Sequence, residues 1–146
     1  MTFSAYKTYK TSARQNMSAP EATALLLEEA SKNMQAACRA IEAGDIETRF
    51  KESEKASLIL GNLEKALVRL DTTQSKTADS LKDYYDDTIS LITRMNINND
   101  HASANSIANS LGKMATEFRK VSVLHEKQLQ EDATPVSTQE GLKVRA

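Results

Sequence analysis

The sequence predicts an all-α protein, an antiparallel four-helix bundle, and three observations support that prediction. Apolar residues recur three and four positions apart in four successive segments, which is the spacing of one face of an α-helix. Helix breakers are rare, with four Gly and two Pro in 146 residues, and Trp is absent, so the composition favours helices over strands. The connections between the segments are short, and short connections make consecutive helices antiparallel.

The first helix is expected to begin at Ser18-Ala19-Pro20-Glu21, which has the pattern of a capping box. In that motif the Ser18 hydroxyl accepts a hydrogen bond from the amide of Glu21, and the Glu21 carboxylate returns one to the amide of Ser18. Gly44 should end this helix, because Gly adopts positive φ readily. The apolar stripe between these ends consists of Ala22, Leu25, Leu26, Ala30, Met34, Ala37 and Ile41.

The second helix can be capped by Asp45, which follows Gly44 directly. Its apolar stripe consists of Ile46, Phe50, Ala56, Leu60, Leu63, Leu67 and Leu70. The polar run 71–75 then forms a connection, and the third helix should begin near Thr77. Its apolar face consists of Leu81, Tyr84, Tyr85, Thr88, Ile92 and Met95.

The run Asn96-Ile97-Asn98-Asn99-Asp100 should close the third helix and open the fourth. Asn tolerates the left-handed conformation at a helix end, and Asn or Asp also makes a strong N-cap. The fourth helix then carries the stripe Ala104, Ile107, Leu111, Met114, Phe118 and Val121, with His125 at its end. We expect one domain over residues 1–131, including the N-terminal segment, and a flexible, disordered tail over 132–146.

The charge and the cysteine content exclude several classes of protein. The net charge is −1, so no strong basic field would attract nucleic acid or an acidic membrane. Cys38 is the single cysteine and cannot form an internal disulfide, which indicates a reducing compartment. The run Ala24–Leu27 is too short to cross a bilayer, and residues 1–6 lack the apolar run of a secretory signal. We expect a cytoplasmic protein without nucleic acid partners or stable membrane insertion.

No pattern of residues indicates an active site. A Glu-x-x-His pair of the di-iron bundles is missing, as is a Gly-rich phosphate loop. His101 stands at a helix start and His125 near the end of a core stripe, whereas histidine phosphotransfer needs an exposed histidine in mid-helix. Cys38 has no activating base nearby in the sequence and is interpreted as an inert small hydrophobe. We therefore expect no enzyme, no cofactor and no metal site.

Several helices carry apolar residues on more faces than contact with one neighbouring helix requires. Leu25–Leu27 and Leu58–Leu60 each cover three successive directions, and Ile89 and Leu91 point away from the line of the third helix's core. Each helix could simply contact two neighbours, or the surface could hold a groove for amphipathic helices of a partner. The aromatic residues of the polar N-terminal segment could cover such a groove or dock elsewhere; they are Phe3, Tyr6 and Tyr9.

Four short motifs occur in order along the chain. They are Ala5-Tyr6, Ser18–Glu21, Ala40–Glu47, and Tyr85-Asp86 followed by Asn96–Asp100. In this order and at this spacing, from about Phe3 to Val121, the chain resembles the flagellin-specific export chaperones of the FliS family. The resemblance implies a bundle that binds the C-terminal region of flagellin and keeps it from polymerising prematurely in the cytoplasm. It also implies delivery of flagellin to a protein of the flagellar type III export gate.

Two other functions stay open beside the export chaperone. One is a helical adaptor or regulatory bundle without a secretion client, and the other is an enzyme or phosphotransfer domain. For the chaperone, the resemblance and the apolar faces together suggest partner-binding residues in the N-terminal segment and on the first three helices. These are Tyr6, Tyr9, Leu27, Ile59, Tyr85, Asp86, Ile89, Asn96 and Asn99.

Overall fold

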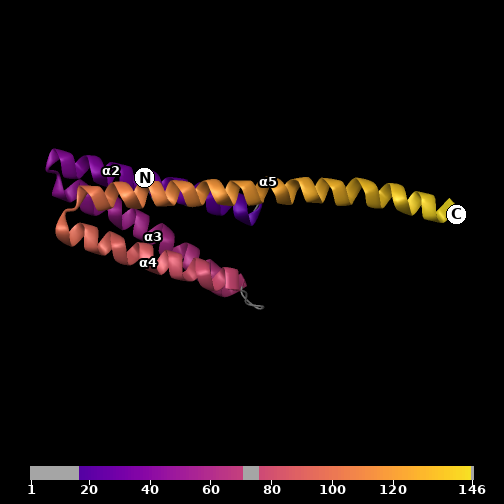
Figure 1. Cartoon of the computed structure of the whole chain (residues 1–146), viewed down its shortest axis with the longest axis horizontal. Coiled ribbons are helices and arrows are strands. Elements are labelled where there is room, and N and C mark those ends of the chain that lie inside the picture. The colour runs from indigo at the N-terminus through magenta and orange to yellow at the C-terminus, as the bar shows by residue number, and fades with distance from the viewer. Residues whose placement is uncertain (1–16, 71–75, 146) are drawn as a thin grey trace.

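Four long helices make up the part of the chain that the computed structural model describes, residues 17–70 and 76–145. They are α2 (Ala19–Ala43), α3 (Ile46–Leu70), α4 (Lys76–Asn98) and α5 (His101–Arg145). Figure 1 shows α2, α3, α4 and the first half of α5 side by side in an up-down-up-down arrangement, with both short turns at one end. The predicted all-α antiparallel bundle is confirmed, and the described residues contain no strand.

Ser18, Gly44 and Asp45 occupy the cap positions predicted for them at the ends of α2 and the start of α3. Ser18 is extended, with φ −68° and ψ 158°, and its Oγ accepts a hydrogen bond from the Glu21 amide at 3.2 Å. Gly44 has φ 73°, the left-handed conformation expected there. Asp45 Oδ1 accepts from the amide of Thr48 at 3.0 Å and so caps α3. These local sequence signals therefore fix the turn between α2 and α3.

At the junction between α4 and α5, two adjacent residues have different roles: Asn99 ends α4 and Asp100 caps α5. Asn99 has φ 51°, the one non-glycine residue with positive φ among those described, and this turns the chain out of α4. Asp100 then caps α5, because its carboxylate accepts from the amide of Ser103 at 3.2 Å and from its hydroxyl at 2.7 Å. These two hydrogen bonds also lower the pKa of the Asp100 carboxyl. The prediction that this run ends one helix and begins the next is confirmed.

The core is centred on α2, which packs most extensively against α5 and then against α3. Small residues permit the close approach of α2 and α5, and Ser31 Oγ of α2 donates a hydrogen bond to the Ala108 carbonyl of α5 at 2.8 Å. By contrast, α4 packs on α3 and contacts α5 least. The large side chains that are fully buried are Leu27, Met34, Leu60, Tyr85, Ile92, Met95 and Leu111.

The last helix is much longer than the bundle. Ser122 is the last buried residue in the part of α5 whose side chains the structure describes, and its hydroxyl lies 3.1 Å from the Ser18 hydroxyl at the start of α2. From Val123 to Asp132 every side chain is exposed, and Figure 1 shows the helix projecting past its neighbours. The helical backbone continues to Arg145, and the side chains of 133–146 lie outside the described residues. The predicted flexibility of 132–146 stays a prediction.

The apolar content of the described helices is too low for a membrane crossing. None of them, not even the longest, contains a stretch that is both long and apolar enough to span a bilayer. Their apolar residues instead gather on faces that pack against neighbouring helices.

Candidate partner-binding groove

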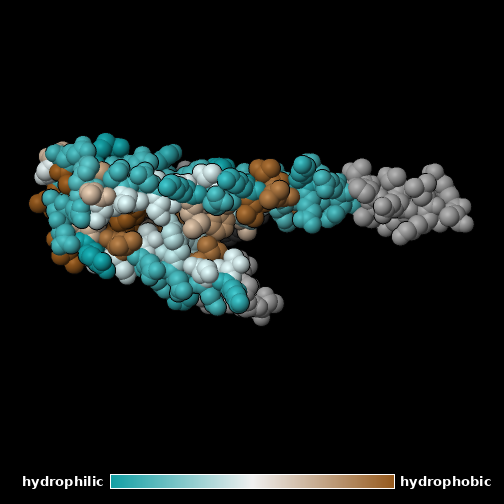
Figure 2. All heavy atoms as spheres, viewed as in Figure 1, coloured by the Kyte–Doolittle hydropathy of each residue, from teal (hydrophilic) through white to brown (hydrophobic). Residues whose placement is uncertain are grey.

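The weak packing of α4 on α5 leaves a hollow between these helices, here called the α4–α5 groove. Its larger part has a volume of about 540 Å³. Tyr84 of α4 lines it together with Ser106, Asn109, Ser110, Lys113, Met114 and Glu117 of α5. Figure 2 shows white and brown atoms between the teal rows of α5 and α4, so the rims are more polar than the floor. This combination suits an amphipathic partner.

The α4–α5 groove continues toward the turn at Asn99. A second hollow of about 310 Å³ shares Ser106 with the first and is lined also by Leu91, Ala102, Ser103 and Ile107. Leu91 is 44% exposed, although it is a large aliphatic side chain. The groove therefore follows α5 over about four turns, from Ala102 to Glu117.

All four helices contribute to a third hollow at the opposite end of the bundle, here called the end pocket. It measures about 160 Å³ and its lining is almost wholly apolar. The lining residues are Ala19, Pro20, Thr23, Leu63, Ala66, Leu67, Leu81, Tyr85 and Phe118. Leu67, Leu81 and Phe118 are only partly buried, so apolar surface remains available there.

Two adjacent tyrosines hold α4 in different ways. The hydroxyl of Tyr84 lies 2.8 Å from the Ser110 hydroxyl of α5, so a hydrogen bond crosses the α4–α5 groove. Tyr85 is 1% exposed and packs in the core, where burial raises the pKa of its hydroxyl. Their rings meet edge to face with centroids 5.9 Å apart. Tyr84 thus belongs to the groove, whereas Tyr85 fixes α4 to the core.

Ion pairs lie along the edges of the bundle. Arg119 of α5 donates two hydrogen bonds of 2.7 Å to the carboxylate of Glu28 on α2, and this pairing lowers the pKa of the Glu28 carboxyl. Lys82 of α4 lies 2.9 Å from Asp86 and 3.4 Å from Glu64 of α3. Lys82 lowers the pKa of Asp86, while the nearby Asp86 carboxylate raises the pKa of Glu64.

Three predicted partner-binding residues are part of the core. Leu27 is 0% exposed and Ile59 3%, and Tyr85, which is 1% exposed, borders the end pocket from within the core. A role of these residues in binding a partner stays a prediction. Leu27 and Ile59 belong to the two triplets that cover three successive directions, and their burial fits helices that each pack against two neighbours. The outward member of the second apolar triplet is Leu58, which is 59% exposed.

Other predicted residues lie on the edge between α3 and α4. Asp86 pairs with Lys82 beside α3, whereas Tyr84 faces α5. Asn96 Nδ2 donates to Ser53 Oγ of α3 at 2.7 Å, and Asn99 Oδ1 accepts from Arg49 of α3 at 2.6 Å. These contacts position the end of α4, and a role of these residues in binding a partner stays a prediction.

Of the three remaining predicted residues, the structure describes Ile89 but not Tyr6 or Tyr9. Ile89 is partly buried against the core. Tyr6 and Tyr9 lie outside the described residues. Among the residues that line the α4–α5 groove, Leu91 was expected to point away from the core. Three others were expected in core stripes, namely Tyr84, Ile107 and Met114, and the rest were not singled out. The signal for the groove was the polar series Ser103, Ser106 and Ser110, which runs beside the apolar stripe of the fourth helix on its α4 side.

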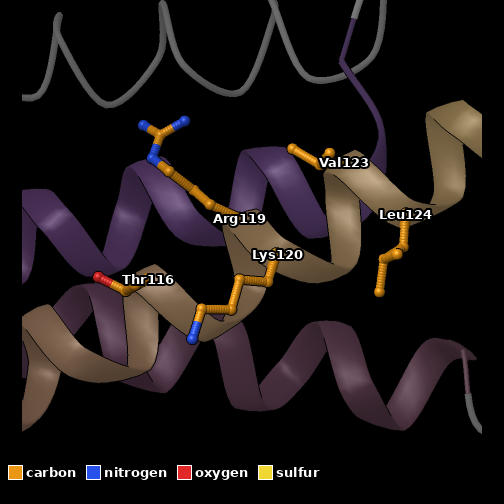
Figure 3. Close-up of a pocket in the computed structure, with 5 residues that line it drawn as sticks. All are labelled: Thr116, Arg119, Lys120, Val123 and Leu124. Atoms are coloured by element: carbon orange, nitrogen blue, oxygen red, sulfur yellow. The ribbon is translucent and has the colours of Figure 1, made fainter.

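A further apolar surface lies where α5 leaves the bundle. Figure 3 shows a hollow lined by Thr116, Arg119, Lys120, Val123 and Leu124, with Arg119 and Val123 on one side of α5 and Lys120 and Leu124 pointing the other way. Val123 and Leu124 are both more than half exposed. The protein therefore presents apolar side chains both between its helices and on the projecting helix.

A comparison with models of protein families gives a match. The model of a family described as flagellar protein FliS matches residues 2–125. The matched range contains every described residue that lines the α4–α5 groove and the end pocket. A comparison with curated proteins finds no match.

Proposed function

The chain belongs to the FliS family of flagellar export chaperones, and from this premise we propose that it binds the C-terminal region of flagellin. In this proposal the bound region is kept from polymerising prematurely in the cytoplasm. The chaperone then aids delivery of flagellin to a protein of the flagellar type III export gate. The protein acts by binding alone and catalyses no reaction.

The observation that carries the proposal is the α4–α5 groove with the end pocket beside it. Most side chains that line the larger part of the groove are polar, and Tyr84 and Met114 lie among them with apolar atoms, so an amphipathic helix can bury its apolar face on these two residues. Its polar face then stays near Lys113 and Glu117 at the rim. Each 100 Å² of apolar surface removed from water contributes about 2.5 kcal/mol before the cost of ordering the partner.

A client that is disordered before binding explains why the surface is spread over several hollows. A disordered segment can follow a long surface and fold on it, although the ordering reduces the affinity per unit of buried area. Short client helices in the α4–α5 groove and the end pocket would hide the apolar faces with which flagellin molecules associate. For the N-terminal segment, a role of Tyr6 and Tyr9 in groove cover or gate docking stays a prediction.

Calorimetric titration with a flagellin C-terminal peptide tests the proposal, with circular dichroism to follow the peptide's helicity. Ser106 is exposed and lines both parts of the groove, so Ser106→Trp should fill it and weaken binding at least about tenfold. Asn105→Trp is the matched control, because Asn105 is exposed on the same helix and lines neither hollow. It should change the affinity less than about twofold.

Two results would contradict the proposal. Absence of binding heat and of added helicity at micromolar concentrations would favour the adaptor or regulatory bundle without a secretion client. Equal binding by Ser106→Trp and the wild-type protein would place the client on another surface than the α4–α5 groove.

A further inference from the structure

Three side chains with metal-binding atoms meet at the end of the bundle where both short turns lie. Cys38 and Glu42 stand four residues apart on α2, which places them on the same face of the helix. His101 is the first residue of α5. One sulfur, one carboxylate oxygen and one imidazole nitrogen from these residues all lie within 4.8 Å of one another.

The surrounding contacts direct these groups toward one point. The Nε2 atom of His101 lies 2.6 Å from Oε1 of Glu42. The thiol of Cys38 donates to the backbone carbonyl of His101 at 3.7 Å, so the sulfur faces the same residue. The left-handed residues Gly44 and Asn99 turn the chain at this end of the bundle, after α2 and before α5.

We propose that Cys38, Glu42 and His101 bind a zinc ion, with the fourth position open to water or an external ligand. Thiolate, imidazole and carboxylate are the ligand types of zinc sites, and zinc prefers four ligands in a tetrahedron. A thiolate and an imidazole argue against Mg²⁺ and Ca²⁺, which take oxygen ligands. The site is independent of the groove, so it does not depend on the identity of the client.

Small side-chain movements suffice to reach the geometry of zinc. Bonds of about 2.0–2.3 Å in a tetrahedron set the ligand atoms about 3.4–3.6 Å apart. The imidazole and the carboxylate must therefore separate from 2.6 Å, and any pair near the 4.8 Å limit must approach. Glu42 and His101 are both exposed and can rotate between rotamers, while the buried Cys38 supplies the fixed ligand.

The thiol must lose its proton to bind the ion. Burial, and then the charge of Glu42, raise the pKa of the Cys38 thiol, which keeps it protonated and inert without a metal. Zinc takes the place of that proton, so one proton is released for each thiolate formed. The bound ion would join the end of α2 to the start of α5 and clamp the turn end of the bundle. The end pocket lies at the other end of the bundle, so none of its lining residues contributes to this site.

Titration of the full chain with zinc, after treatment with a chelator, tests the proposal by calorimetry and by cobalt absorption. We expect one ion per chain, a rise in Tm with zinc, and a thiolate-to-cobalt charge-transfer band together with the intense visible bands of tetrahedral cobalt. Glu42→Gln and His101→Gln should each weaken binding at least about tenfold. His125→Gln is the control, because it removes the other histidine, which is exposed on α5 far along the chain from the site.

Cys38→Ser should remove the charge-transfer band. Because Cys38 is buried, the helicity of this variant is measured as well, and the two surface variants carry the test if it unfolds. The proposal is overturned if the wild-type chain binds no zinc, if bound cobalt shows no thiolate band, or if His101→Gln binds zinc as tightly as the wild-type chain. Titration of His101→Gln with the flagellin peptide separates the two proposals, since its peptide affinity should be unchanged.

Discussion

The hydroxyl of Tyr84 on α4 lies 2.8 Å from the hydroxyl of Ser110 on α5, across the groove that otherwise separates these helices. This hydrogen bond sets the distance between the two walls at a place where packing between them is weak. A partner helix in the groove would have to accommodate this bond or replace it. The hydrogen bond between Tyr84 and Ser110 therefore affects both the stability of the bundle and the access of a partner to the groove.

The first prediction concerns the energy of that hydrogen bond. Tyr84→Phe should lower the free energy of unfolding by about 0.5–1.5 kcal/mol, because a partly buried hydrogen bond is lost while the ring stays. Urea unfolding of Tyr84→Phe, Ser110→Ala and the double variant gives the coupling energy of the pair. If the two single effects add without coupling, the hydroxyls do not interact in solution.

The second prediction concerns pH and the ion pair between Glu28 and Arg119. Arg119 lowers the pKa of Glu28 from its ordinary 4.5, so the folded state holds the proton less tightly than the unfolded state. The pair therefore contributes stability above pH 4.5, and this contribution is lost as the pH falls through the lowered pKa. Both side chains are more than a third exposed, so screening by solvent keeps the effect small.

Unfolding curves from about pH 6 to about pH 3 measure that contribution. Arg119→Gln should lose less stability on acidification than the wild-type protein. Lys120→Gln is the matched control, because Lys120 pairs with Glu117 of its own helix and both are 65% exposed. An identical pH dependence of Arg119→Gln and the wild-type protein would show that the Glu28 pairing contributes nothing measurable.

The third prediction separates core leucines from surface leucines. Leu27→Ala should destabilise the bundle by about 2–5 kcal/mol, because Leu27 is fully buried and its loss leaves a cavity. Leu58→Ala should change stability by less than about 0.5 kcal/mol, since Leu58 is 59% exposed. Thermal and urea unfolding compare the two. A small effect of Leu27→Ala would mean that this side chain is not in the core and could face a partner after all.

The fourth prediction concerns the cap of α5. Asp100→Ala should cost about 1 kcal/mol, because the amide of Ser103 loses its acceptor at the first turn. Asp87→Ala serves as the control, since Asp87 is exposed in the interior of α4, and it should change stability by less than about 0.5 kcal/mol. Equal effects of the two variants in urea unfolding would exclude a capping role of Asp100.

Local sequence signals predicted most of the fold and little of the site. The helix caps depend only on the cap residue and on residues a few positions away in the sequence. Their roles could therefore be inferred from the chain alone, as for Ser18, Gly44 and Asp100. The burial of Leu27 and Ile59 could not be inferred from the chain alone, because it depends on which neighbouring helix covers them. The start of α4 at Lys76 differs by one residue from the predicted Thr77, within the range in which helix ends fray.

The sequence by itself determined the number of helices in the bundle, their direction and the residues at the two short turns, because capping and apolar periodicity are local properties. Only the tertiary structure decided which helix contacts which. Because α2 takes the central position, α4 is left weakly packed on α5, and the groove opens along Tyr84, Ser106 and Met114. The meeting of Cys38 with His101 is likewise a tertiary fact, since 63 residues separate them along the chain and only the antiparallel bundle joins the helix ends that carry them.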